Sequence, residues 1–173
     1  TLLSEYKIQS RGGVGNKAAT TRDSDFLEYI VSATNHQYML FFAEKGKCYW
    51  LRVVEIPEGS KTAKGRAVQN LINIEPDDKI KAYIRTNNLK DLEYVNQMSV
   101  VMVTRNGTIK KTSLEAYSRP RVNGVNAIEI RDNDQLLGAY LTNGTSEIMI
   151  ATKNGKCIRF PEAKVREVGR GSI

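Results

Sequence analysis

Short apolar runs, broken at intervals by polar turns, dominate the hydrophobic pattern of this chain. Three segments superpose when they are aligned on a glycine: residues 40–50, 101–111 and 149–159. Each is an apolar run, a polar dipeptide ending in Lys or Asn, the glycine, and a second strand-like run. Asn-Gly between β-rich runs is a strong hairpin signal, because both residues can take positive φ. The pattern therefore predicts three equivalent β-hairpins.

The hairpins belong to a longer repeat. Their glycines, Gly46, Gly107 and Gly155, are 61 and 48 residues apart, and the longer interval fits an insertion near residues 86–97. A further strand is predicted upstream of each hairpin, at residues 26–33, 80–85 and 136–142. Several strands in each unit of roughly 50 residues are typical of a propeller-like array. A β-sandwich would not repeat its own sequence, so an all-β, propeller-like fold is favoured.

The repeat also gives an expectation for several single residues. Cys48 and Cys157 each lie two residues after a hairpin glycine, where the middle unit has Ile109. We therefore expect both cysteines to be small buried apolar residues rather than disulfide partners or zinc ligands. Trp50 is expected to pack or to lie at a strand edge. His36, the only histidine, is expected in a solvated turn.

A loop rich in glycine and basic residues follows each hairpin, and a similar loop lies near the start. These loops are residues 9–17, 59–66, 118–124 and 166–171. Tyr6 precedes Gly13 by the same seven residues that separate Tyr117 from Gly124, so all four loops are expected at one place in the repeat. Acidic residues follow the loops by about ten residues, which predicts that basic and acidic positions separate in the array. They are Asp23, Asp25, Glu75, Asp77, Asp78, Asp132 and Asp134.

The charge balance favours a polyanionic partner. The chain has 26 Lys and Arg against 19 Asp and Glu, a net charge of +7. Lys and Arg release counterions when they neutralise phosphates, and glycines let backbone N–H groups approach phosphate oxygens. Aromatic residues are not interleaved with the loops, which favours duplex DNA over single strands. The expected DNA-binding residues are Gln9, Arg11, Gly12, Gly13, Gly15, Lys17, Lys61, Lys64, Arg66, Arg119, Arg121, Arg166 and Arg170.

Other classes of protein are disfavoured. No apolar run approaches the length of a membrane span, and the N-terminal residues lack the pattern of a signal peptide. The start without Met indicates a fragment. No Ser/His/Asp set or cluster of metal ligands is evident, so we expect neither a catalytic centre nor a cofactor in this chain. The Gly12-Gly13-x-Gly15 pattern matches neither a P-loop nor a dinucleotide fingerprint.

Residues 9–15, Gln-Ser-Arg-Gly-Gly-Val-Gly, resemble the GyrA-box, the Gln-Arg-Arg-Gly-Gly-x-Gly heptapeptide of the C-terminal DNA-wrapping domain of DNA gyrase A. The likeness to this family runs along essentially the whole chain and includes residues 3–6, 25–51, 56–58 and 65–71. Two positions depart from the usual box. Ser10 stands where the family usually has Arg, and Val14 occupies a position that is often Lys, so this box carries less charge.

The resemblance implies a β-pinwheel, a propeller-like disc of four-stranded blades whose rim wraps double-stranded DNA. Residues 1–173 are expected to form a partial array of about three blades that starts and ends mid-repeat. The implied role is to support ATP-dependent negative supercoiling by DNA gyrase, a type IIA topoisomerase. Its cleavage tyrosine, its ATPase site and the ATP and Mg²⁺ that it uses are expected elsewhere, in the N-terminal core of gyrase A and in gyrase B. A cytoplasmic, nucleoid-associated location is implied, and exposed strand edges are expected to allow pairing between copies.

Two alternatives remain open. The equivalent C-terminal domain of topoisomerase IV shares the blade pattern but generally lacks an intact box, and the Gly-Gly-x-Gly core favours gyrase. A propeller scaffold that binds acidic protein partners would also explain basic loops.

Overall fold

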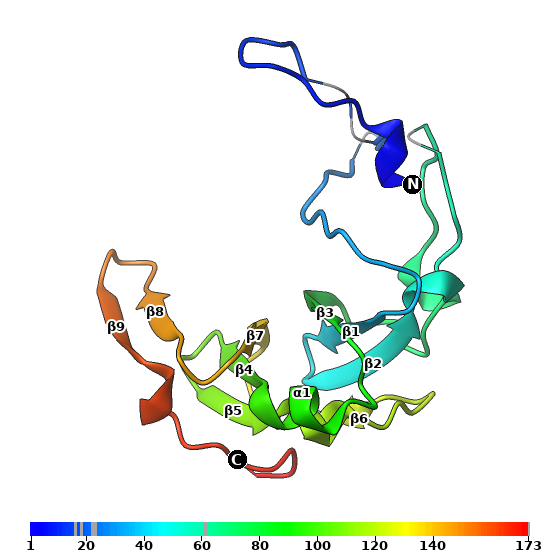
Figure 1. Ribbon diagram of the computed structural model, residues 1–173. Helices are drawn as coiled ribbons and strands as arrows, with labels where there is room; N and C mark the ends of the chain where they lie inside the picture. Colours follow the sequence, from blue (N-terminus) through cyan, green and yellow to red (C-terminus); the bar gives the residue numbers. More distant parts are fainter. Residues whose placement is uncertain (16, 18, 22–23, 61, 173) are drawn as a thin grey trace.

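Three antiparallel sheets, each built on one β-hairpin, follow one another along an open arc in the computed structural model (Figure 1). The structure describes residues 1–15, 17, 19–21, 24–60 and 62–172. The predicted hairpins are confirmed as β1–β2, β4–β5 and β8–β9. Their strands are β1 (Tyr38–Ala43), β2 (Lys47–Arg52), β4 (Ser99–Thr104), β5 (Ile109–Ser113), β8 (Glu147–Ala151) and β9 (Cys157–Pro161).

Strands from the following unit complete the first two sheets. The remaining strands are β3 (Ile80–Thr86), β6 (Val125–Asn126) and β7 (Leu136–Thr142). Strand β3 pairs with β1 and β6 pairs with β2, which gives the order β3-β1-β2-β6. Strand β7 pairs with β4 in the order β5-β4-β7, and β8 pairs with β9. The strands predicted at 80–85 and 136–142 are thus confirmed, and each belongs to the sheet of the hairpin before it.

The hairpin turns differ from the type expected for Asn-Gly. Gly46, Gly107 and Gly155 have φ of 88°, 90° and 78°, whereas none of the residues that directly precede them has positive φ. Each glycine N–H donates to the carbonyl three residues earlier, with N···O distances of 2.9–3.0 Å. This is a type I turn followed by a left-handed glycine, the usual three-residue hairpin loop. Glycine is the residue that takes this conformation without strain.

The strand predicted at residues 26–33 is not formed. Phe26 and Ile30 are 77% and 85% exposed, and the segment lies beside β3 without joining a sheet. Two contacts hold it there: the Tyr29 and Tyr83 rings lie 5.4 Å apart, and Arg85 Nη1 donates to the carbonyl oxygen of Ser32 at 2.9 Å. Strands β3 and β7 each pair with the hairpin of the preceding unit. Among the described residues before position 26 there is no hairpin with which the segment pairs in the same way.

Strand β1 is buried on both faces and separates two apolar clusters. Leu40 and Phe42 pack toward the second sheet, in the larger cluster. Met39 and Phe41 point the other way, because side chains alternate along a strand, and they pack with Ile72 beyond the 3₁₀ turn η3 (Val68–Asn70). The larger cluster therefore joins the first two sheets at the centre of the arc.

Trp50 and His36 lie as expected. Trp50 is 9% exposed, and its Nε1 donates to the carbonyl oxygen of Tyr117 at 2.9 Å, so it packs between two units. His36 is exposed in the turn before β1.

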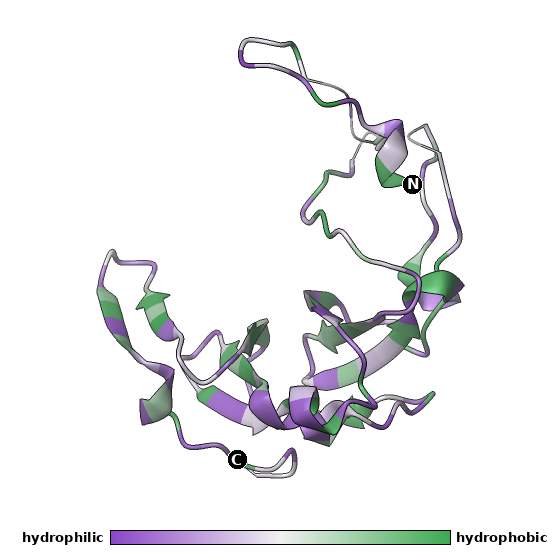
Figure 2. Ribbon diagram, in the orientation of Figure 1, coloured by the Kyte–Doolittle hydropathy of each residue, from purple (hydrophilic) through white to green (hydrophobic). Residues whose placement is uncertain are grey.

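The expectation for the cysteines is half wrong. Cys48 is fully buried in β2, but Cys157 is exposed in β9, and both are free. Strand β2 lies between β1 and β6, and residues of both apolar clusters pack against its two faces. Strand β9 pairs with β8 alone among the described residues, and its residues are exposed or half-buried. Bands of hydrophobic and hydrophilic residues alternate along it (Figure 2). Equivalent places in the repeat therefore differ in burial.

The predicted insertion contains a short helix, α1 (Leu92–Gln97), between β3 and β4. The Asp91 carboxylate caps it by accepting from the backbone N–H of Tyr94 at 3.2 Å. Val95 is fully buried and fixes the helix to the larger cluster. Across the described part of the chain, no helix has the length and apolar character needed to span a membrane.

Candidate nucleic-acid interface

The four basic loops occupy equivalent places, as predicted. Each follows a 3₁₀ turn. The loops at 59–66, 118–124 and 166–171 lie toward the outer side of the arc, the first loop extends from η1 across its open mouth, and β3 and β7 line the inner side (Figure 1). The turns are η1 (Leu3–Glu5), η2 (Val53–Glu55), η4 (Leu114–Tyr117) and η5 (Glu162–Lys164). At the last three loops the 3₁₀ turn leads the chain from the hairpin into the loop. The basic loops therefore recur at one place in the repeat.

The start of the chain contacts the second loop. Thr1 Oγ1 donates to the carbonyl oxygen of Gly59 at 2.8 Å, which links the start of the chain to the second loop. In the first loop, Gly12 has φ of 82° and Gly13 N–H donates to the Ser10 carbonyl at 3.2 Å, which closes a tight turn. The predicted residues of these two loops are exposed: Gln9, Arg11, Gly12, Gly13, Gly15, Lys17, Lys64 and Arg66. Lys61 lies outside the described residues, as do Asn16 and the acidic residue Asp23.

The last two loops converge on one cleft of about 470 Å³, which we call the basic cleft. Arg121 from one loop and Arg170 from the other line it together with Lys47 of β2. Arg119 and Arg166 are exposed on the same loops but do not line it. The other residues of the basic cleft are Asn123, Gly124, Val125, Asn126 and Gly171.

Both walls of the basic cleft are held in place by buried contacts. Lys110 is 4% exposed, and its Nζ donates to the carbonyl oxygens of Arg170 and Ser172 at 2.6 and 2.7 Å. Burial, and then the charge of Arg170, lower the pKa of Lys110, although Glu129 opposes this. On the other wall Gly124 has φ of 69°, and a Cβ there would lie 2.8 Å from the Cys48 carbonyl oxygen. The backbone on both sides is thereby fixed.

Sequence reasoning missed Lys47 and Lys110, because both belong to hairpin strands rather than to loops. A signal for Lys47 did exist, since Gly-Lys follows the turn in both the first and third hairpins. Lys47 Nζ donates to Glu75 Oε1 at 2.7 Å, and this hydrogen bond is the main cause of the raised pKa of Lys47. Lys47 thus brings a partly neutralised charge to the basic cleft.

Carboxylates of the acidic turns accept hydrogen bonds from backbone N–H groups at the tips of the first two hairpins. Asp78 Oδ1 accepts from the backbone N–H of Lys45 at 3.1 Å, and Asp134 Oδ1 accepts from that of Asn106 at 3.0 Å. Lys45 Nζ also pairs with Asp77 at 2.6 Å. These acids lie apart from the basic loops, as expected, but the separation is incomplete because Glu75 reaches a lysine of the basic cleft.

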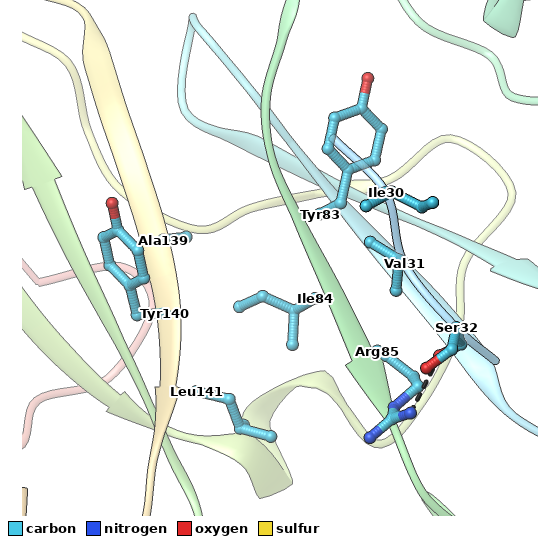
Figure 3. A pocket seen from close by; sticks show the side chains of 9 residues that line it. All are labelled: Ile30, Val31, Ser32, Tyr83, Ile84, Arg85, Ala139, Tyr140 and Leu141. Atoms are coloured by element: carbon cyan, nitrogen blue, oxygen red, sulfur yellow. Dashed lines mark hydrogen bonds between the residues drawn. The ribbon is translucent and has the colours of Figure 1, made fainter. Parts of the chain in front are cut away.

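A second cleft, of about 420 Å³, lies between residues 30–32, β3 and β7 (Figure 3). Its lining is mostly apolar and aromatic, with Tyr83 and Tyr140 on opposite sides (Figure 3). Arg85 is committed to the Ser32 carbonyl. Among the residues that the structure describes, no three His, Cys, Asp or Glu side chains are placed to hold a metal ion. The described loops present exposed cationic side chains.

Comparison with known proteins gives a family match along the chain. Residues 1–34, 37–87, 99–143 and 146–173 match the family model described as "DNA gyrase C-terminal domain, beta-propeller". Residues 88–98, which include α1, lie outside the match, in agreement with the predicted insertion.

Curated relatives are similar over almost all of this chain. The DNA gyrase A protein of Buchnera aphidicola subsp. Baizongia pistaciae is 39% identical over 99% of the chain and 20% of the relative. The DNA gyrase A protein of Salmonella typhimurium is 39% identical over 97% of the chain and 19% of the relative. The chain thus spans about a fifth of the length of these relatives.

Solved structures share the fold. The C-terminal domain of DNA topoisomerase IV superposes with a TM-score of 0.74 at 30% identity, over 88% of this chain and 46% of that one. A DNA gyrase A C-terminal domain superposes with a TM-score of 0.66 at 18% identity, over 98% of this chain and 52% of that one, which supports the fold alone. The propeller-like fold class is confirmed.

Proposed function

The chain belongs to the DNA gyrase C-terminal domain family, and from this premise we propose that it binds duplex DNA along its outer side and wraps it across the basic loops. The observation that carries the proposal is the recurrence of an exposed basic loop at one place in each unit. The proposed contacts are Gln9, Arg11, Gly12, Gly13, Gly15, Lys17, Lys61, Lys64, Arg66, Arg119, Arg121, Arg166 and Arg170.

The physical basis is phosphate neutralisation on a curved surface. Loop cations release counterions when they meet phosphates, which favours binding without regard to base sequence. Loops spaced along an arc contact a duplex together only if the duplex bends, so sequence preference would arise from the deformability of the DNA. The lining of the basic cleft contains no aromatic residue on which an unpaired base could stack.

In the whole protein, wrapping by this domain would set the handedness of the DNA crossing that is presented to the catalytic core. The domain would thereby support ATP-dependent negative supercoiling without a catalytic centre of its own. Its partners would be the N-terminal core of gyrase A and the gyrase B protein, in the bacterial cytoplasm. These are proposals because the chain spans about a fifth of the length of its curated gyrase relatives.

A second candidate is the corresponding domain of topoisomerase IV. The 30% identity and TM-score of 0.74 to that enzyme's C-terminal domain favour it. The Gly12-Gly13-x-Gly15 core of the box favours gyrase instead. The two candidates differ in whether the first loop produces wrapping, which the effect of Arg11→Ala and Lys17→Ala on plasmid supercoiling measures.

Duplex affinity measured by mobility shift at several salt concentrations tests the proposal. If about eight phosphates are contacted, the slope of log K against log salt is expected near −7. Lys153→Ala, at the third hairpin tip and outside the basic loops, is the control and should leave the slope unchanged. Binding that is absent at low salt, or that does not respond to salt, would contradict DNA binding and favour a protein-binding scaffold.

A further inference from the structure

The basic cleft joins parts of three successive units. Lys47 comes from the first hairpin, Arg121 from the loop after the second, and Arg170 from the loop after the third. Residues so distant in sequence share a cleft only because the units pack closely along the arc. A ligand held there would contact all three units at once.

Positive charge in the basic cleft is only partly balanced. Glu75 pairs with Lys47, but within the described ranges no carboxylate lies within 4.0 Å of a side-chain nitrogen of Arg121 or Arg170. Buried Lys110 lies behind Arg170, and in the described part of the chain its Nζ donates to backbone carbonyls. The charge of Arg170 helps to lower the pKa of Lys110, so these two cations repel each other in the free protein. A bound anion would relieve that repulsion.

The walls of the basic cleft are fixed before any ligand arrives. Lys110 holds the carbonyls of Arg170 and Ser172, and Val168 N–H donates to the Lys111 carbonyl oxygen at 2.9 Å. Gly124 lies against the Cys48 carbonyl and the Tyr49 ring, where a side chain would not fit. A site with a preformed backbone loses less entropy when it binds its ligand.

We infer that the basic cleft is a discrete binding site for one phosphate group, shared by Arg121 and Arg170 with Lys47 beside them. A guanidinium group can donate two parallel hydrogen bonds to two oxygens of one phosphate, and Arg is therefore common at phosphate sites. The inference rests on the proposed function when the ligand is a DNA phosphate, and it assigns two of the proposed contacts to a single phosphate. The other cations of the loops would act independently.

A double-mutant cycle tests whether the two arginines share one phosphate. Duplex affinity is measured for Arg121→Gln, Arg170→Gln and the double variant at matched salt. Shared binding predicts that the double variant loses at least about threefold less affinity than the product of the two single losses. Its salt slope should fall by about 0.9, the value for one phosphate. Losses that multiply would overturn the inference.

Arg119→Gln and Arg166→Gln provide the matched control. They lie on the same two loops and remove the same charge, but they do not line the basic cleft. Their losses are expected to multiply. Equal non-additivity in this pair would attribute the effect to general charge and would also overturn the inference. Thermal unfolding of all variants should be unchanged, because these side chains lie outside the core.

A titration with inorganic phosphate separates this inference from the proposed function. With ionic strength held constant by chloride, the amide resonances of Gly124, Asn126 and Gly171 should shift and saturate in the unmodified chain. They should not shift in the double variant Arg121→Gln/Arg170→Gln. The absence of saturable shifts in the unmodified chain rejects the site. If the chain shows these shifts but does not bind duplex DNA, the site stands and the proposed function fails.

Discussion

Glu162 stands in the third unit where Leu114 stands in the second, seven residues after the hairpin glycine. Both side chains are fully buried, but neither carboxylate oxygen of Glu162 has a hydrogen-bond partner among the described residues. A buried polar atom without a partner loses its hydration without compensation. The 3₁₀ turn η5, directly after the third hairpin, therefore carries a destabilising residue where the second unit has a buried leucine.

Replacing Glu162 by leucine should stabilise the chain. We expect Glu162→Leu to raise the free energy of unfolding by about 1–3 kcal/mol, since it removes two unsatisfied oxygens from a buried site. Urea denaturation of the full chain measures this. Glu162→Gln is the control and should gain less, because its amide remains polar. A loss of stability in the leucine variant would show that the carboxylate has a partner.

At the scale of elements, the three hairpins share a turn but differ in what lies around it. Gly46 and Gly107 have nearly the same φ, 88° and 90°. A Cβ at Gly46 would collide with the backbone carbonyl of Ile128, whereas nothing lies within 4 Å of a Cβ at Gly107. The next unit encloses the first turn at its glycine, whereas the space beside the glycine of the second turn is open.

Alanine at these two glycines should therefore have unequal effects. Gly107→Ala is expected to cost about 1–2 kcal/mol, the strain of a left-handed residue alone. Gly46→Ala should cost at least about 3 kcal/mol, because the clash adds to the same strain. Thermal or urea unfolding of both variants checks this, with Gly107→Ala as the matched control. Equal losses would contradict the enclosed turn.

Acid should weaken the hydrogen bonds that the Asp134 carboxylate accepts at the tip of the second hairpin. Burial favours a raised pKa at Asp134, but hydrogen bonds from Thr104 and from the backbone N–H groups of Asn106 and Gln135 outweigh it, and the pKa is lowered. The ionised form is thus favoured by folding. Its stabilising effect is complete above the unfolded pKa and is lost as the pH falls through the folded one.

Titration of the Asn106 and Gln135 amide resonances by NMR measures this dependence. Their midpoint is expected below the ordinary aspartate pKa of about 3.9. Asp134→Asn serves as the control, since the transition should disappear from it. A midpoint at or above the ordinary value would argue against these hydrogen bonds.

At the scale of the whole molecule, the units are joined by shared strands. Strand β3 closes the first sheet and β7 the second, so neither sheet is complete without the unit that follows. The same joining brings the loops at 59–66, 118–124 and 166–171 to the outer side of the arc (Figure 1). If the chain wraps duplex DNA as proposed, the bend of the duplex would follow the arc, and the loops at its far ends would contribute most to wrapping.

Changes in the first loop should affect wrapping more than affinity. Arg11→Ala combined with Lys17→Ala removes the two cations of the box loop, which should lower affinity modestly and reduce the supercoils constrained on a relaxed plasmid more strongly. A relaxation assay with a type I topoisomerase measures the constrained supercoils. Lys153→Ala with Lys156→Ala removes the same charge outside the loops and should change neither. Wrapping that persists in the box variant would show that this departure from the usual heptapeptide is inert.

The sequence by itself determined the features that depend on local pattern. Apolar runs around a glycine specified the three hairpins, and the spacing from Tyr117 to Gly124 placed the loops at one position in the repeat. Such signals are local because turns and strands follow from backbone preferences and alternating burial over a few residues. The family resemblance rested on the same local motifs and was confirmed.

Only the tertiary structure decided what depends on neighbours distant in sequence. Residues 26–33 have strand character but pair with no hairpin, and Cys157 is exposed where Cys48 is buried, because partners rather than sequence determine pairing and burial. Lys47 joined Arg121 and Arg170 for the same reason, since the packing of units creates the basic cleft. A repeat specifies equivalent elements, but the contacts between units make their environments differ.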